Sequence, residues 1–238
     1  MHRSGHVRRK ETEMAVTANP EYGRFMEEIV RKLVERYAEY ENVKDTIVYK
    51  LVNTEKNRDI LDDSPHREFM DLSAVYCICF ILPDGRTGSV AVNGRLAEKW
   101  GVTEEELWNL AHANTQRIFP AKVRNLQDVI QPLWEKSLQT TDLGKIMAAV
   151  TNEEYWYGAG VVFYDDVLSR LTDMLGDRLF LIPSSVHEFF VFSDDGILDP
   201  GFFSDLAKRI NESRLPDKEY LSDHVYRYEK GGGITIAG

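Results

Sequence analysis

The pattern of apolar and polar positions predicts a chain that mixes strands with helices. The segment Ser73–Leu82 is apolar at both alternating sets of positions, which is typical of a strand covered on both faces. Pro83-Asp84-Gly85 then predicts a turn into a second strand at Gly88–Val92. Shorter runs predict further strands at Thr46–Leu51, Ile146–Val150, Gly158–Phe163, Leu179–Ile182, Glu188–Phe192 and Val225–Tyr228.

Apolar side chains that recur every three or four positions predict the helices. Thr103, with Glu106 three positions later, forms a capping box that opens a helix reaching about Ile118. Gly176 ends a helix that begins near Asp165. Other helices are expected at Glu21–Glu41, at Leu126–Leu138 and after Asp199. Because the strands fall mostly in hairpins, we expect an α+β fold with mainly antiparallel sheet and about five helices.

The expected organisation is two α+β halves around a helical connection. Residues 1–19 lack periodicity, so we expect them to be a disordered or over-called N-terminal extension. In the second case Met14 is the true initiator, and residues 1–13 are not part of the protein. The parts that follow are an N-terminal α+β half (20–120), a connecting helical segment (121–144), a C-terminal α+β half (145–229) and a flexible tail (230–238).

The composition is that of a globular protein, with 43% hydrophobic and 29% charged residues. The net charge is −10, and because residues 1–13 carry +2, residues 14–238 carry −12. A surface this negative repels phosphate backbones, so nucleic acid is disfavoured as a partner. The same charge raises another hypothesis, an acidic mimic of nucleic acid.

The two cysteines and the hydropathy point to the cytoplasm. Cys77 and Cys79 share one face of a strand, and their spacing fits neither a disulfide framework nor a zinc or redox motif. We therefore interpret them as core residues. The longest apolar run, Ala74–Leu82, is far shorter than the ~20 residues that cross a bilayer. The sequence predicts no membrane association and no cofactor.

The densest cluster of polar residues with catalytic potential is Ser184, Ser185, His187 and Glu188. One interpretation is a serine nucleophile with a histidine base, as in a hydrolase. No G-x-S-x-G elbow is present, and Ser185 and His187 would lie ~6.6 Å apart along a strand. The alternative is a hairpin turn whose hydroxyls satisfy backbone groups. His187 with Asp223 and His224 is a weak candidate for a metal site, because no metal-binding spacing is present.

Three consecutive aromatic residues, Tyr155, Trp156 and Tyr157, form the main candidate binding surface. Tyrosine and tryptophan are enriched at protein interfaces. The same residues could equally plug a core beside Gly158-Ala159-Gly160, whose glycines allow close approach of another group. That glycine pair lacks the pattern of a dinucleotide-binding loop.

Several segments together resemble an uncharacterised bacterial family, the domain of unknown function 5688. They are Phe69–Tyr76, Trp100–Leu107, Ala111–Thr115, Thr151–Ala159, Leu181–Glu188 and Leu221–Tyr228. The resemblance covers most of the chain from about residue 22 to 228. It implies a bacterial intracellular protein and no established activity. It marks as motif positions Asn114, Ser184, Ser185, His187, Glu188, Ser222 and Asp223.

These observations leave three hypotheses for function. A non-catalytic protein-binding or regulatory module with an unknown protein partner is favoured, because catalytic signatures are missing and the aromatic segment offers a contact surface. A hydrolase or metal-dependent enzyme would use the segment Ser184–Glu188. An acidic nucleic-acid mimic would need carboxylates aligned on one face.

Overall fold

The computed structural model describes residues 24, 28, 31–32, 37, 39–82, 85–125, 147–196, 200–212 and 216–237. The chain divides into two compact units, residues 1–44 and residues 45–238. In the first unit the described positions from 24 to 32 and position 37 are helical, and a 3-10 turn, η1, follows at Tyr40–Asn42. The predicted extension at 1–19 and the predicted helix at Leu126–Leu138 lie outside the described residues.

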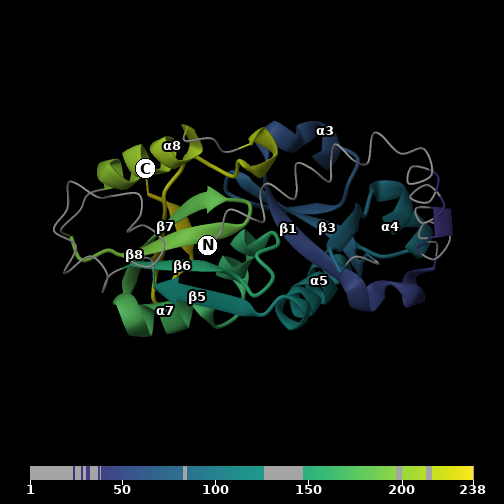
Figure 1. Ribbon diagram of the computed structural model, residues 1–238, viewed down its shortest axis with the longest axis horizontal. Helices are drawn as coiled ribbons and strands as arrows, with labels where there is room; N and C mark the ends of the chain where they lie inside the picture. The colour runs from purple at the N-terminus through teal and green to yellow at the C-terminus, as the bar shows by residue number, and fades with distance from the viewer. Residues whose placement is uncertain are drawn as a thin grey trace. The chain divides into compact units, whose positions relative to one another are not determined.

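The second unit begins with an antiparallel sheet centred on β3 (Leu72–Ile81) (Figure 1). Strand β1 (Ile47–Asn53) pairs with one edge of β3, while β2 (His66–Phe69) and β4 (Thr87–Ala91) pair with the other. The first eight residues of β3 are buried, so the prediction of a strand covered on both faces is confirmed.

Helix α5 (Glu104–Ile118) packs against β1, where the Trp108 ring lies 5.2 Å from the Tyr49 ring. The predicted capping box is present. The Glu106 N–H donates to Thr103 Oγ1 at 3.2 Å, and the Thr103 N–H donates to Glu106 Oε2 at 2.8 Å. Short helical elements complete this part of the unit: η2 (Lys44–Thr46), η3 (Glu55–Asn57), α3 (Arg58–Leu61) and α4 (Gly94–Trp100).

A second antiparallel sheet has the strand order β10-β9-β7-β8-β6-β5. Its strands are β5 (Ala121–Asn125), β6 (Met147–Asn152), β7 (Arg178–Ser185), β8 (Glu188–Ser193), β9 (Tyr226–Glu229) and β10 (Ile234–Ile236). Helix α8 (Pro200–Glu212) and the 3-10 turn η6 (Asp217–Glu219) lie between β8 and β9 in the sequence.

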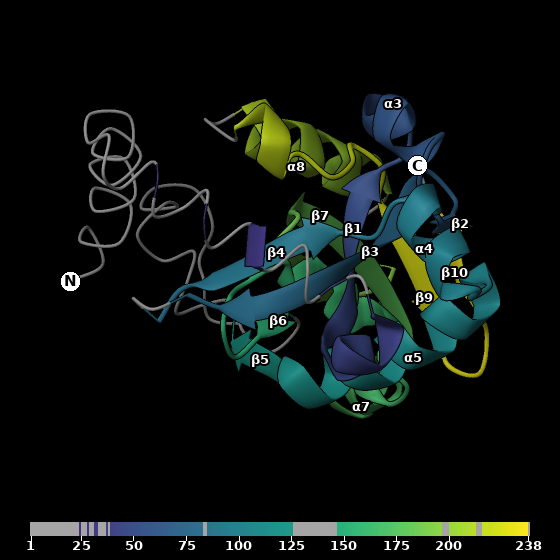
Figure 2. The ribbon, with the colours of Figure 1, turned by 90° about the vertical axis from the view of Figure 1, so that its right-hand side faces the viewer.

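Two helices lie on opposite sides of the second sheet, as Figures 1 and 2 show. Helix α8 inserts Phe203 and Ala207 into an apolar cluster on one face of the sheet. Helix α7 (Val167–Leu175) lies on the other side and ends at Gly176, whose φ of +102° fits the predicted helix stop. The cluster under α8 consists of Ala149, Phe180, Ile182, Phe192, Phe203, Ala207 and Val225.

Some local predictions differ from the structure. Gly158–Phe163, predicted as a strand, forms a 3-10 helix, η5. Its apolar run does not distinguish a strand from a buried helical turn, and the surrounding packing decides between them. Ala121–Asn125 forms strand β5 where the sequence predicted the start of a helical connection. In the predicted flexible tail, β10 pairs with β9 as a hairpin.

The predicted fold class is confirmed, since the strand pairs of both sheets are antiparallel and the helices pack around them. Within the described residues, no helix is both long enough and apolar enough to cross a membrane.

We predict that Gly158→Ala destabilises the fold. A Cβ at this position would lie 2.6 Å from the His187 carbonyl oxygen, 2.8 Å from the Asn152 nitrogen and against Thr151 Oγ1. Overpacking of this kind costs about 1–3 kcal/mol or more. The matched control is Gly233→Ala, because nothing lies within 4 Å of the added Cβ there. Urea unfolding measures both variants, and equal midpoints would contradict the prediction.

Candidate functional site

The segment η5 joins the two sheets of the second unit. The Tyr49 hydroxyl, from the first sheet, donates a 2.8 Å hydrogen bond to the Gly160 carbonyl. The Ala159 N–H donates to the Val186 carbonyl at 3.2 Å, in the turn between β7 and β8 of the second sheet. A Cβ on Gly160 would lie 2.9 Å from the Tyr49 ring. The glycine therefore permits the close contact that brings the sheets together.

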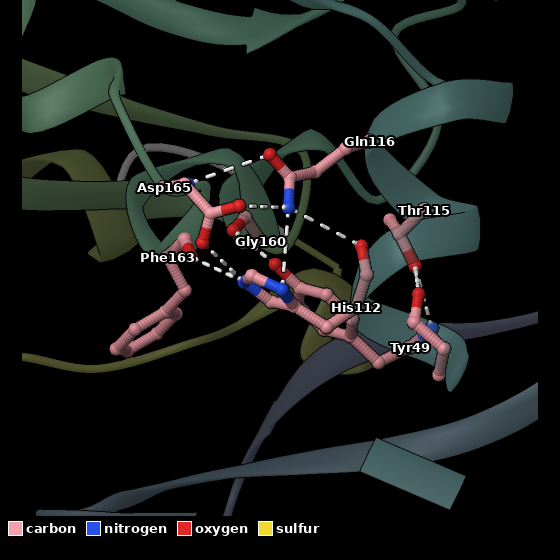
Figure 3. Close-up of polar contacts among 8 residues, drawn as sticks. Tyr49, His112, Thr115, Gln116, Gly160, Phe163 and Asp165 are labelled. Atoms are coloured by element: carbon pink, nitrogen blue, oxygen red, sulfur yellow. Dashed lines mark hydrogen bonds and ion pairs between the residues drawn. The ribbon is translucent and has the colours of Figure 1, made fainter. Parts of the chain in front are cut away.

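A polar network around His112 strengthens the same junction (Figure 3). His112 Nε2 lies 2.8 Å from the Phe163 carbonyl oxygen, and its Nδ1 lies 3.2 Å from Gln116 Nε2. The Gln116 amide also donates to Asp165 Oδ2 at 3.2 Å. Both imidazole nitrogens thus have partners, and the network attaches α5 to the segment between η5 and α7.

The motif around Asn114 attaches α5 to β1. Asn114 Nδ2 donates to the Ile47 carbonyl at 3.0 Å. Thr115 Oγ1 accepts the Tyr49 N–H at 3.0 Å and donates to the Ala111 carbonyl at 2.6 Å. All five residues are buried, and unpaired polar groups are costly in such a place. These contacts give the motif a role in folding.

Ser184 and Ser185, two of the catalytic candidates, are the buried last residues of β7, just before the turn to β8. Ser184 Oγ donates to the Glu188 carbonyl at 3.3 Å. Ser185 Oγ accepts the main-chain N–H of His187 at 3.1 Å. The contact between Ser185 and His187 therefore runs through the backbone, as in a turn stabilised by serine hydroxyls.

His187 faces the aromatic segment. The Tyr157 N–H donates to His187 Nδ1 at 3.1 Å, and the two rings lie 5.4 Å apart. This bond makes Nδ1 an acceptor, so the neutral imidazole carries its proton on Nε2. The His187 carbonyl accepts a 2.7 Å bond from Thr151 Oγ1. The structure thus brings two of the candidate sets together, His187 with Tyr157.

Glu188 is a partly buried carboxylate at the start of β8. Arg124 Nη2 lies 3.2 Å from Glu188 Oε2. Burial raises the pKa of the Glu188 carboxyl, and this effect outweighs the opposing attraction of Arg124. Among the candidates in the segment Ser184–Glu188, Glu188 is therefore the one whose pKa the fold shifts.

The aromatic segment is divided among three environments. Tyr155 is 45% exposed, and Lys122 Nζ and Arg124 Cζ each lie 5.0 Å from the centre of its ring. Trp156 packs against Phe119, with ring centres 5.0 Å apart. Tyr157 turns toward His187. Trp156 therefore packs over the core, whereas the Tyr155 ring is exposed at the surface.

Both tyrosines of this segment have positive φ, +53° at Tyr155 and +47° at Tyr157. Such values are uncommon for residues other than glycine and cost of order 1–3 kcal/mol. Asn152 supports the turn, because its side chain accepts the Trp156 N–H at 3.0 Å and donates to the Trp156 carbonyl at 2.7 Å. The fold therefore holds the two rings in place against backbone strain.

Asp223 and His224, two of the weak candidates for a metal site, have hydrogen-bond partners of other kinds. Asp223 and His224 are exposed; Asp223 Oδ1 accepts from Asn211 Nδ2 at 2.6 Å, and the His224 N–H donates to Ser222 Oγ at 2.9 Å. Across the ranges that the structure describes, no three His, Cys, Asp or Glu side chains gather where they could hold a metal ion.

The motif containing Ser222 links the two sheets at a second place. Ser222 Oγ donates to Asp71 Oδ2 at 2.6 Å, and the Tyr226 hydroxyl donates to Asp71 Oδ1. Asn53 Nδ2 donates to the Leu221 carbonyl at 3.0 Å. Burial and the Asp71 carboxylate raise the pKa of Tyr226, so the phenol stays protonated and keeps donating.

The two cysteines are free and buried on the face of β3 near Phe119 and Trp156. Burial raises the pKa of the Cys77 thiol to about 12, and it also raises that of Cys79. Because the thiolate is the reactive form, neither cysteine is activated as a nucleophile.

A cavity of about 680 Å³ opens beside Tyr157, at the junction of the two sheets. Residues of β1 and β3 line it from the first sheet, and Tyr157 and Val186 border it from the η5 side. Its described lining includes three lysines, which the sequence analysis did not single out: Lys50, Lys56 and Lys218. They lie on three separate elements, β1, η3 and η6, so no motif signals them.

The protein is a two-sheet α+β protein. A glycine-containing 3-10 segment joins its two antiparallel sheets, and a lysine-lined cavity lies at the junction. The chain belongs to a family of unknown function, DUF5688, whose model matches residues 11–230. The predicted family resemblance is thereby confirmed. No curated protein and no solved structure shows a significant match to the chain.

We predict that Glu188→Gln changes the pH dependence of stability. The folded-state pKa of Glu188 is raised, so its contribution to stability is full below the ordinary glutamate pKa and is lost as pH rises through the folded value. The free energy of unfolding of the wild type should therefore fall relative to that of Glu188→Gln as pH rises across this window.

Urea unfolding at a series of pH values measures the difference between the two proteins. Glu229→Gln, at an exposed position, is the control. A difference between wild type and Glu188→Gln that stays constant with pH would contradict the assignment.

Proposed function

We propose that the protein is a non-catalytic binding or regulatory module of the bacterial cytoplasm, which contacts a protein partner through the surface around Tyr155. The observation that supports this proposal is the exposed Tyr155 ring, held at positive φ between Lys122 and Arg124. Tyrosine and arginine are among the residues that contribute most to binding energy at interfaces.

The surface around Tyr155 is already ordered before a partner binds. Lys122 Nζ pairs with Glu153 at 2.9 Å and Arg124 with Glu188 at 3.2 Å. These pairs hold the cationic side chains along β5, beside the aromatic ring. Fixing side chains in advance lowers the entropy cost of association. A partner would contact the Tyr155 ring and the aliphatic parts of Lys122 and Arg124 in the positions that they already occupy.

The hydrolase hypothesis receives less support from the geometry. Serine nucleophiles are activated by a hydrogen bond from the hydroxyl to a base. Here Ser185 Oγ accepts a main-chain N–H, and His187 Nδ1 accepts the Tyr157 N–H. Both groups thus have roles within the turn. The hypothesis of an acidic nucleic-acid mimic rests, as before, on net charge alone.

We predict that Tyr155→Ala abolishes partner binding while leaving the fold intact. The chain, tagged and purified gently from its native host, should co-elute with one protein at near-equal stoichiometry. Loss of a central aromatic anchor costs about 2 kcal/mol or more, which is more than a tenfold loss of affinity. Quantitative mass spectrometry of the co-eluting protein measures the loss.

The matched control is Phe202→Ala, which removes a 39% exposed aromatic ring from α8 instead. It should retain the partner at the wild-type level. Equal retention by Tyr155→Ala and the wild type, or equal loss in both variants, would refute the role of Tyr155.

A further inference from the structure

The cavity beside Tyr157 has the size of a small-molecule site. Its volume of about 680 Å³ lies within the range of roughly 300–1,000 Å³ that ligand pockets occupy. Apolar side chains form part of its wall, namely Val52 and Val75 of the first sheet and Val186 of the β7–β8 turn. The cavity can therefore enclose an apolar body the size of one or two rings.

The charge of the cavity is opposite to that of the protein. The chain as a whole carries −10, whereas the described lining of the cavity contains three lysines and neither aspartate nor glutamate. Charges of one sign that line a concave site reinforce one another, because the low-dielectric wall focuses their field. An acidic protein with a basic cavity attracts anions to that place in particular.

Two of the lysines lie over tyrosine rings. Lys50 Nζ lies 4.5 Å from the centre of the Tyr157 ring, and Lys56 Nζ lies 3.4 Å from that of Tyr220. In the part of the chain that the structure describes, neither ammonium group has a carboxylate within 4.0 Å. A cation–π contact positions an ammonium group without neutralising its charge. Within the described residues, no ion pair therefore occupies either ammonium group, and both can contact a ligand.

The fold fixes the position of the Tyr157 ring. Its backbone is held at a φ of +47° by the bond from its N–H to His187 Nδ1, and the next residue, Gly158, is packed closely against the His187 carbonyl. Residues with strained backbone conformations persist only where the surrounding packing holds them, and they are concentrated at binding sites. The Tyr157 ring and the ammonium of Lys50 are thus arranged before any ligand enters.

We propose that this cavity binds an organic anion, namely a ring-sized apolar or aromatic body that carries a phosphate or carboxylate group. Lys50 and Lys56 bind the anionic group, Tyr157 and Tyr220 flank the body, and the valines enclose it. The site goes beyond the protein-binding proposal and does not depend on it, because Tyr155 does not line the cavity.

The test uses naphthyl phosphate as a fluorescent probe, with anisotropy measured on the full chain at neutral pH. Naphthoate and the neutral naphthol are compared with it. Both anions should bind at least tenfold more tightly than naphthol, and the tighter of the two identifies the preferred anionic group. Lys50→Met should weaken naphthyl phosphate binding about tenfold or more, because it removes a charged hydrogen-bond donor.

Lys208→Met is the matched control, since it removes the same charge from an exposed position on α8 outside the cavity. Its affinity should equal that of the wild type. Lys56→Met, at an exposed position, tests the same site if Lys50→Met fails to fold. Binding of naphthol as tight as that of both anions would overturn the proposal. So would equal effects of the cavity variants and Lys208→Met.

Discussion

The hydrogen bond from the Tyr49 hydroxyl to the Gly160 carbonyl is the contact on which the arrangement of the second unit depends. It joins β1 of one sheet to η5, and η5 is in turn bound to the β7–β8 turn of the other. Successive residues of a strand point to opposite faces. With Tyr49 directed to the junction with α5, Lys50 lies on the face where the cavity opens. The contact of Tyr49 at the junction thus leaves Lys50, the first cation of the cavity, on the opposite face of β1.

The other motif residues act on the same junction from outside the cavity. The network of His112 attaches α5 to the end of η5, and Asp71 attaches the β2–β3 turn to Ser222 and Tyr226. These groups are buried or partly buried and hydrogen-bonded, so their loss would leave costly unpaired partners. Ser185 Oγ, which accepts the His187 main-chain N–H, is hydrogen-bonded within the β7–β8 turn in a similar way. The groups that we propose for binding are the lysines and tyrosines of the cavity.

The sequence predicted elements whose causes are local. The capping box at Thr103, the helix stop at Gly176 and the double-sided burial of β3 depend on neighbouring residues or on one strand's own pattern. The 3-10 conformation of Gly158–Phe163 was missed because the segment packs against residues distant in the sequence, such as Tyr49, more than a hundred positions away. Of the residues that line the cavity, the sequence analysis singled out Tyr157, because it is one of three consecutive aromatic residues. The lysines were not, because they stand on separate elements, and only the folded chain brings Lys218 to the cavity that Lys50 and Lys56 line.

The central claim is that β1 and the segment beside η5 line one ligand-binding cavity. Hydrogen–deuterium exchange with and without naphthyl phosphate tests this claim most directly. The account predicts that peptides from β1 and from the Tyr157–Phe163 segment gain protection together, while peptides from α8 do not change. Protection of only one of the two segments, or equal protection of α8, would contradict a ligand site built at the junction.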